Sequence, residues 1–102
     1  MLTTDNQVSY TFDSGGEHWV YRFPNNYGAS VIRTIFSYGN SKGLYELAVI
    51  KWQSLDMDAW NIEYTTPITD DVIGSCTADD IGKLLNQIKE LKMSLKHNTL
   101  NT

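Results

Sequence analysis

The sequence of 102 residues has one cysteine and two prolines, and charged residues make up only 20% of it. Because one cysteine cannot form an internal disulfide, Cys76 indicates a reducing compartment. We expect no signal peptide and no membrane span, because no basic segment followed by an apolar one opens the chain and no apolar run is long enough. The formal net charge of -4 makes direct nucleic-acid binding an unfavourable interpretation, since phosphate contacts need clustered Lys and Arg.

Linkers and repeats are also absent. No proline-rich stretch, low-complexity tract or internal repeat divides the chain. We therefore expect residues 1–102 to form a single domain, because the length is typical of one. The polar, aperiodic ends are expected to fray, which leaves an ordered core over about residues 8–96.

Five segments have the alternation or the β-branched and aromatic content of strands, and short turns rich in Gly and Asn separate them. They are Val8–Phe12, His18–Phe23, Ala29–Tyr38, Leu44–Trp52 and Trp60–Tyr64. Leu44–Trp52 is apolar on both faces, which is typical of a central strand. The pattern predicts an antiparallel meander sheet of four to five strands.

One helix is expected after the strands. Thr77 is a favourable N-cap, and Asp80 lies three residues later, where it completes a capping box. Apolar residues then recur at helical spacing: Ile81, Leu84, Leu85, Ile88, Leu91 and Leu95. This stripe should pack on one face of the sheet, which gives an α+β fold. Gly82 lowers helix propensity, and we interpret it as a point of close backbone approach.

Four residues are candidates for binding a nucleotide. Tyr27 and Tyr38 stand beside glycines whose backbone N–H groups are accessible, and Arg33 and Trp52 complete the set. The aromatic rings would stack on a base and the guanidinium would bind phosphate, a role for which Arg22 is also available. Turn glycines and core aromatics are the alternative interpretation.

An acidic strip is the candidate surface for a protein partner. Seven acidic residues and no basic one lie between Asp56 and Asp80, among them Asp56, Asp58, Asp70 and Asp71. Such a strip suits a basic partner, and a solvated face is the alternative. The aspartate spacing does not match a calcium loop, and neither histidine has ligand spacing, so no metal or cofactor is expected. Cys76 is interpreted as a buried small residue rather than a nucleophile.

The aromatic content of 12% exceeds what one interface between a sheet and a helix must bury. Some of the aromatic residues are therefore expected to face outward: Trp19, Tyr21, Tyr45, Trp52, Trp60 and Tyr64. The second face of the central strand would also need a cover. Self-association would supply one, so we expect a homo-oligomer.

Several segments resemble a family of small, mostly uncharacterised accessory proteins encoded by bacteriophages and prophages. They are Tyr27-Gly28-Ala29-Ser30-Val31, Phe36-Ser37-Tyr38-Gly39, Gly43-Leu44-Tyr45-Glu46-Leu47-Ala48-Val49, Tyr64-Thr65-Thr66-Pro67-Ile68-Thr69-Asp70-Asp71-Val72-Ile73-Gly74 and the helix begun by Thr77. The resemblance covers roughly Trp19 to Leu91. It implies a phage origin, an accessory role and a location in the host bacterial cytoplasm, and it assigns no functional residue.

Two functions from different classes fit these features. The first is a non-enzymatic phage accessory protein that counters a host process, such as a defence system, by sequestering a nucleotide signal or blocking a host protein. The second is a phage structural or assembly component, because open-edged antiparallel sheets suit assembly. An enzyme that uses the aspartate pairs and a metal is a weaker third hypothesis.

Overall fold

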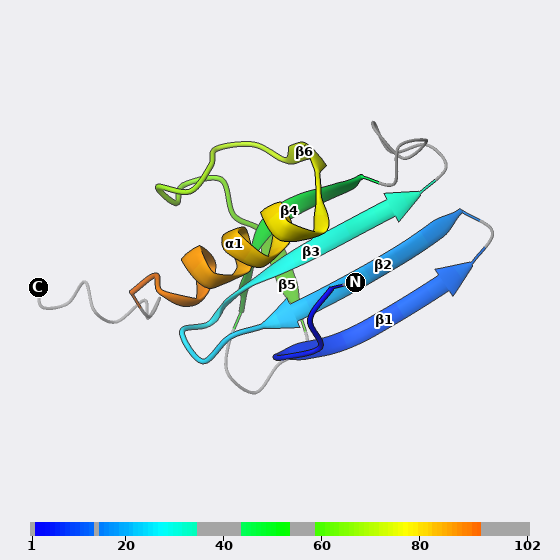
Figure 1. Cartoon of the computed structure of the whole chain (residues 1–102). Coiled ribbons are helices and arrows are strands. Elements are labelled where there is room, and N and C mark those ends of the chain that lie inside the picture. The colour runs from blue at the N-terminus through cyan, green and yellow to red at the C-terminus, as the bar shows by residue number, and fades with distance from the viewer. Residues whose placement is uncertain (1, 14, 35–43, 54–58, 93–102) are drawn as a thin grey trace, which may run out of the picture.

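The chain folds into one antiparallel sheet with a single helix packed on it, which confirms the predicted α+β class. A computed structural model describes residues 2–13, 15–34, 44–53 and 59–92 (Figure 1). The strands are β1 (Gln7–Asp13), β2 (Gly16–Arg22), β3 (Tyr27–Thr34), β4 (Tyr45–Trp52), β5 (Trp60–Ile62) and β6 (Ile73–Cys76). The helix α1 spans Ala78–Lys89.

The strands follow one another across the sheet in the order β1-β2-β3-β4-β5, as the predicted meander requires. The remaining strand, β6, also pairs with β4. It pairs with the start of β4, at Tyr45 and Leu47. β5 pairs with the end of β4, from Ile50 to Trp52. Together, β5 and β6 therefore occupy the side of β4 that faces away from β3.

β6 is the strand that the sequence did not predict. The segment Ile73–Cys76 is short and contains Gly74 and Ser75, and Ser75 has a positive φ of 57°. Such residues disfavour a strand. Its extended form is supported by tertiary pairing with β4, which no local pattern reveals.

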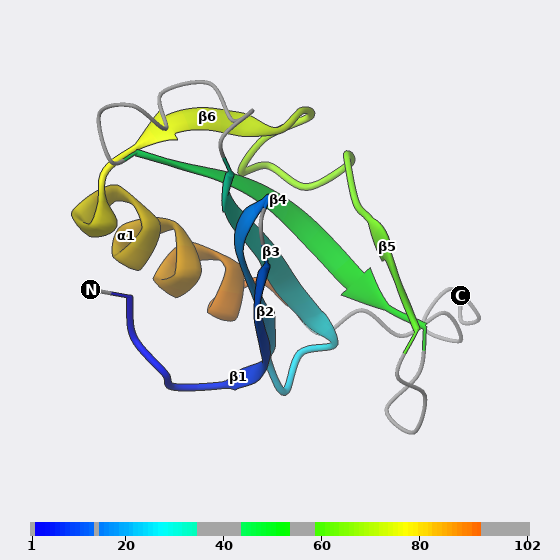
Figure 2. The ribbon, with the colours of Figure 1, turned by 90° about the vertical axis from the view of Figure 1, so that its right-hand side faces the viewer.

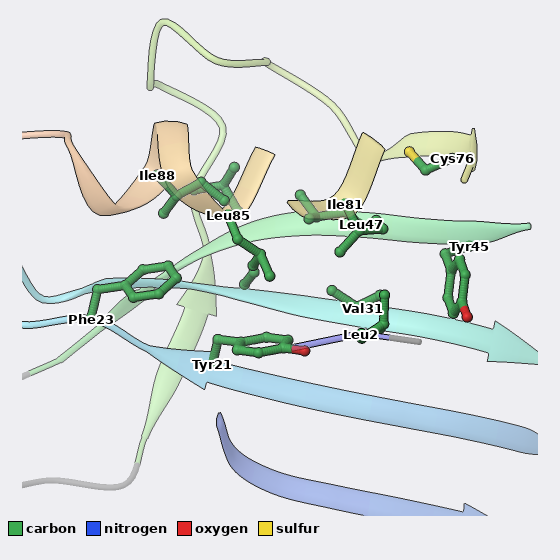
Figure 3. Packing of buried hydrophobic residues seen from close by; sticks show 12 residues of the cluster. Leu2, Tyr21, Phe23, Val31, Tyr45, Leu47, Cys76, Ile81, Leu85 and Ile88 are labelled. Carbon is green, nitrogen blue, oxygen red and sulfur yellow. The ribbon is translucent and has the colours of Figure 1, made fainter. Parts of the chain in front are cut away.

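α1 begins as its capping box predicts. The Asp80 amide donates to Thr77 Oγ1 over 3.1 Å, and the Thr77 amide donates to Asp80 Oδ2 over 2.9 Å. These two bonds satisfy amides that would otherwise lack a partner in the first turn. Ile81, Leu85 and Ile88 are buried. Figure 3 shows them pointing toward the sheet, and Figure 2 shows the helix on one face of it.

Gly82 corrects one expectation. A Cβ added at Gly82 would meet no atom within 4 Å, so no neighbouring backbone approaches it closely. The residue instead lines an open groove of about 480 Å³ between the N-terminal segment and the side of α1 next to it. Packing within the described chain therefore does not explain this glycine.

The N-terminal segment also differs from the expected frayed end. Leu2 is only 8% exposed and belongs to the main core. The Tyr21 hydroxyl donates to the carbonyl of Thr3 over 2.8 Å. An apolar anchor and a hydrogen bond thus hold this segment against β2, next to the helix-covered part of the sheet.

The turn between β2 and β3 joins distant elements. The side-chain amide of Asn25 donates to the carbonyls of Ile88, Lys89 and Leu91 at the end of α1, over 2.8, 3.2 and 3.0 Å. The amide of Asn26, which has a φ of 72°, donates to the carbonyl of Trp52 over 2.7 Å. Both asparagines are buried. The turn therefore holds the end of the helix and the end of β4 together.

Within the described ranges, no helix is both long and apolar enough to cross a membrane.

Candidate functional site

The two most exposed large apolar residues, Val8 and Phe12, lie on β1, which forms one border of the sheet (Figure 1). Val8, Tyr10 and Phe12 are 54%, 45% and 72% exposed. Among the described strands, β1 pairs only with β2. Every second residue of an antiparallel strand directs its N–H and C=O away from its neighbour. β1 therefore presents apolar side chains together with backbone groups available for another strand.

β1 has few of the features that protect sheet edges. The strand contains no Lys, Arg or Pro. Natural edge strands often use such residues to prevent pairing with other chains. A bulge lies between Gln7 and Ser9, so residues 9–13 form the regular part of the strand. This regular part is the portion that a further strand could continue.

The side chain of Tyr10 is held in place by a network on the sheet face. Its ring packs on Trp19 at 5.4 Å, and its hydroxyl donates to Glu17 over 2.8 Å. Glu17 also accepts from Arg33, whose Nη2 lies 2.6 Å from Oε1. The guanidinium of Arg33 lies over the ring of Tyr45. Tyr10 is thus oriented before any partner arrives, which lowers the entropy lost on binding.

This network changes the acidity of its members. The hydrogen bond from Arg33 lowers the pKa of Glu17 below its usual value, because it stabilises the carboxylate. The hydrogen bond to Glu17 raises the pKa of the Tyr10 hydroxyl, because it stabilises the protonated form. Glu17 is therefore an ionised acceptor for both neighbours at neutral pH.

The opposite face of the sheet contains a second candidate site. Val20, Ile50 and Trp52 form a small buried cluster against which Trp60 packs. The guanidinium of Arg22 lies 4.5 Å from the centre of the Trp52 ring. A recess of about 340 Å³ opens here, lined by Val8, Ser9, Val20, Arg22, Trp52 and Trp60. Its lining combines apolar side chains, two indoles and one guanidinium.

The structure does not bring the predicted nucleotide residues together. Tyr27 and Arg33 lie six residues apart on β3, which separates them by about 20 Å along the strand. Tyr27 packs against the main core, whereas Trp52 belongs to the cluster on the other face. Tyr38 lies outside the described residues. Trp52 alone reaches a recess, and its cationic neighbour there is Arg22.

The predicted acidic strip is only partly described. Asp70 and Asp71 are exposed in the segment between β5 and β6. Asp71 Oδ1 accepts from the Val72 amide, and its carbonyl accepts from the Thr69 hydroxyl, so Asp71 stabilises a local turn. Asp56 and Asp58 lie outside the described residues. The two described aspartates remain accessible to solvent or to a partner.

Cys76 has the environment of a structural residue. It is buried beside the start of α1. Burial and the nearby Asp80 carboxylate raise the pKa of the thiol, so the thiol is protonated at neutral pH. No group of three His, Cys, Asp or Glu side chains suited to a metal ion occurs in the described part of the chain.

Of the six aromatic residues among which some are expected to face outward, three are buried, two are half-buried and one is exposed. Tyr21, Tyr45 and Trp52 are buried, whereas Tyr64 is 48% exposed. Ile50 and Trp52 on the second face of β4 are also buried within this one chain, so they need no cover from another molecule. The two most exposed large apolar residues, Val8 and Phe12, lie on the β1 edge rather than on the central strand β4.

Sequence reasoning missed the β1 edge, the role of Arg22 beside Trp52, and the two asparagines. The available signal for β1 was its alternation of apolar residues without any basic residue or proline. The Arg22–Trp52 contact joins β2 and β4 across β3, and no pattern within either segment indicates it. The chain matches no protein-family model, no curated protein and no solved structure.

Proposed function

We propose that this chain is a bacteriophage accessory protein that counters a host process, such as a defence system, by non-enzymatic binding to a host protein through β1. The observation that supports this most directly is the exposure of Val8, Tyr10 and Phe12 on an edge strand. Exposed apolar residues on an open edge are typical of interaction sites. The phage-like segments from Trp19 to Leu91 support the viral source and the accessory role.

In the proposed complex, an extended segment of the host protein adds as a strand beside residues 9–13. Main-chain hydrogen bonds would supply affinity, and alternate side chains would supply specificity. Tyr10 and Phe12 would contact aromatic or β-branched residues on the added strand, since such cross-strand pairs stabilise sheets. The contact of Tyr10 with Trp19 favours this arrangement by fixing its ring beforehand.

The experiment compares tagged wild-type protein with Phe12→Lys and Phe12→Tyr during infection. Phe12 is 72% exposed, so its replacement should change the free energy of unfolding by no more than about 0.5 kcal/mol. We expect Phe12→Lys to lose the host protein that wild type captures, because a charge on the edge opposes strand addition. Phe12→Tyr should retain it.

Val72→Lys is the matched control, because Val72 is 40% exposed and lies away from β1. This variant should capture the same host protein in the same amount as wild type. Mass spectrometry of the captured proteins gives the readout. Equal capture by wild type and Phe12→Lys would contradict the proposal.

A second candidate function is self-association, in which β1 of one copy pairs with β1 of another. If two copies pair antiparallel about Thr11, Tyr10 of each copy lies opposite Phe12 of the other. This arrangement would give the expected homo-oligomer, and it suits the alternative role as a phage structural or assembly component. Sedimentation velocity at increasing concentration separates the two candidates. Dimerisation abolished by Phe12→Lys, with the protein present in purified virions, would favour assembly.

A further inference from the structure

The recess beside β5 is formed by residues from four strands. The register pairs Trp52 with Trp60, so their side chains lie on the same face. Arg22 extends toward them from β2, and Val8 and Ser9 form the rim at the start of β1. The volume of about 340 Å³ is at the lower end of the range for ligand pockets. The recess therefore suits a small molecule rather than a peptide.

The floor of the recess is rigid. The indole nitrogen of Trp52 donates to the carbonyl of Tyr21 over 3.3 Å, across β3. This approach is possible because Gly28 stands between them. A Cβ at that position would lie 2.9 Å from the indole nitrogen and 1.9 Å from the Tyr21 oxygen. A fixed indole loses little conformational entropy when a ligand binds beside it.

The chemistry of the lining indicates the ligand class. Arg22 is the only charged side chain among the six lining residues. Its planar guanidinium lies over the Trp52 ring, and a guanidinium both stacks on rings and forms two parallel hydrogen bonds with phosphate or carboxylate. Trp60, which is half-buried, supplies an indole surface for a second ring.

We propose that this recess binds a small anion that contains a planar ring, as nucleotides do, with the ring against Trp60 and the anionic group on Arg22. The site lies on the sheet face opposite α1 and does not involve Tyr10 or Phe12. It shares Val8 and Ser9, at its rim, with β1, but neither of the two side chains proposed above to contact the added strand. The two proposals can fail independently, because Phe12→Lys leaves the six lining residues unchanged.

The test is a titration of the full chain with AMP, followed by the indole N–H signals in nitrogen-15 NMR spectra. The sequence contains three tryptophans, so each gives its own signal. We expect AMP to move the signals of Trp52 and Trp60. The signal of Trp19 should stay in place, because this residue packs on the helix side of the sheet. Adenosine, which lacks the phosphate, should bind at least about tenfold more weakly.

Benzoate and inorganic phosphate complete the set of probes. Benzoate presents a ring and a charge without a nucleoside. If benzoate binds as tightly as AMP, the result would support an anion with a planar ring as the ligand class and would exclude a preference for nucleotides. If inorganic phosphate alone moves the same signals as strongly as AMP does, the proposed role of the ligand's ring would be overturned. Absence of any indole shift at about 1 mM AMP and benzoate would overturn the proposal as a whole.

Two substitutions assign the anionic contact. Arg22→Gln should make AMP and adenosine bind equally, whereas Arg22→Lys should retain part of the preference because it keeps the charge without the planar fork. Arg33→Gln is the control, since Arg33 does not line the recess. It lies at the end of β3 far from Gly28 and pairs with Glu17. Equal loss of AMP binding in Arg33→Gln and Arg22→Gln would contradict the assignment.

Discussion

The indole of Trp52 on β4 reaches across β3 and donates to the carbonyl of Tyr21 on β2, 3.3 Å away. Gly28, on the intervening strand, has no side chain to block it. One hydrogen bond thus links β2 and β4 across β3 and fixes the ring over which Arg22 lies. The glycine is therefore required for both the sheet and the recess.

Gly28→Ala should destabilise the protein strongly. The added Cβ would lie 1.9 Å from the backbone oxygen of Tyr21, which cannot move without shifting β2. We expect a loss of about 3 kcal/mol or more in the free energy of unfolding, as for severe overpacking. Chemical denaturation followed by tryptophan fluorescence measures the loss. A free energy of unfolding equal to that of wild type would show that β2 and β3 can move apart to make room for the added Cβ at little cost.

Gly82→Ala is the matched control for Gly28→Ala, because it makes the same substitution at a glycine without close neighbours. Nothing lies within 4 Å of an added Cβ there, and alanine favours helix more than glycine does. We expect this variant to be more stable than wild type by about 0.5–1 kcal/mol. The same denaturation experiment applies, and a decrease in stability would reveal a contact at this position.

Asn25→Ala should loosen the end of α1. The side-chain amide of Asn25 donates to the carbonyls of Ile88, Lys89 and Leu91 at the end of the helix, and of these the Ile88 carbonyl also accepts from the Leu91 amide. Its loss should cost about 2 kcal/mol, because one buried and two partly buried hydrogen bonds would be lost.

Asn25→Asp should cost more, since a carboxylate cannot donate and its charge would face the negative end of the helix dipole. Hydrogen exchange of the last turn of α1 and the unfolding midpoint are the readouts. Equal stability of the two variants would show that charge at this helix end has no effect.

The stability of the Tyr10 network should depend on pH through Glu17. Arg33 holds the pKa of this carboxyl below its ordinary value of 4.5, so the folded state favours the ionised form. The resulting stabilisation is complete above the unfolded pKa and is lost as pH falls through the folded pKa.

Glu17→Gln should therefore be less stable than wild type by up to about 1 kcal/mol at neutral pH, as expected for a partly exposed ion pair. The difference should vanish near pH 2, where both proteins are uncharged at this position. Denaturation curves at the two pH values measure it. A difference that persists unchanged in acid would place its origin outside the ion pair.

Local patterns predicted most of the fold. Alternation together with β-branched and aromatic content indicated four to five strands, and Thr77 with Asp80 indicated the start of the helix, because each of these signals depends on residues close in sequence. β6 was missed because Gly74 and Ser75 have poor strand propensity and adopt their form through pairing with β4. The capping of α1 by Asn25 joins residues 63 positions apart or more, and no periodicity indicates it.

The candidate sites were harder to predict, for a geometric reason. Tyr27 and Trp52 are both aromatic candidates for stacking on a base, yet strand register places them on opposite faces of the sheet. Arg22 and Trp52 meet because β3 lies between β2 and β4 and contains Gly28. Which strand is an edge depends on the complete order, so the exposure of Phe12 could not be derived from its own segment.

The most direct test of binding through β1 is photo-cross-linking in infected host cells. Benzoylphenylalanine replaces Phe12 in one protein and Val72 in another, both at exposed positions. We predict that the position-12 probe forms a cross-link to one host protein, and that the Val72 probe does not. A position-12 probe that links only to a second copy of this chain, or to nothing that the Val72 probe does not also capture, would contradict host-protein binding through β1.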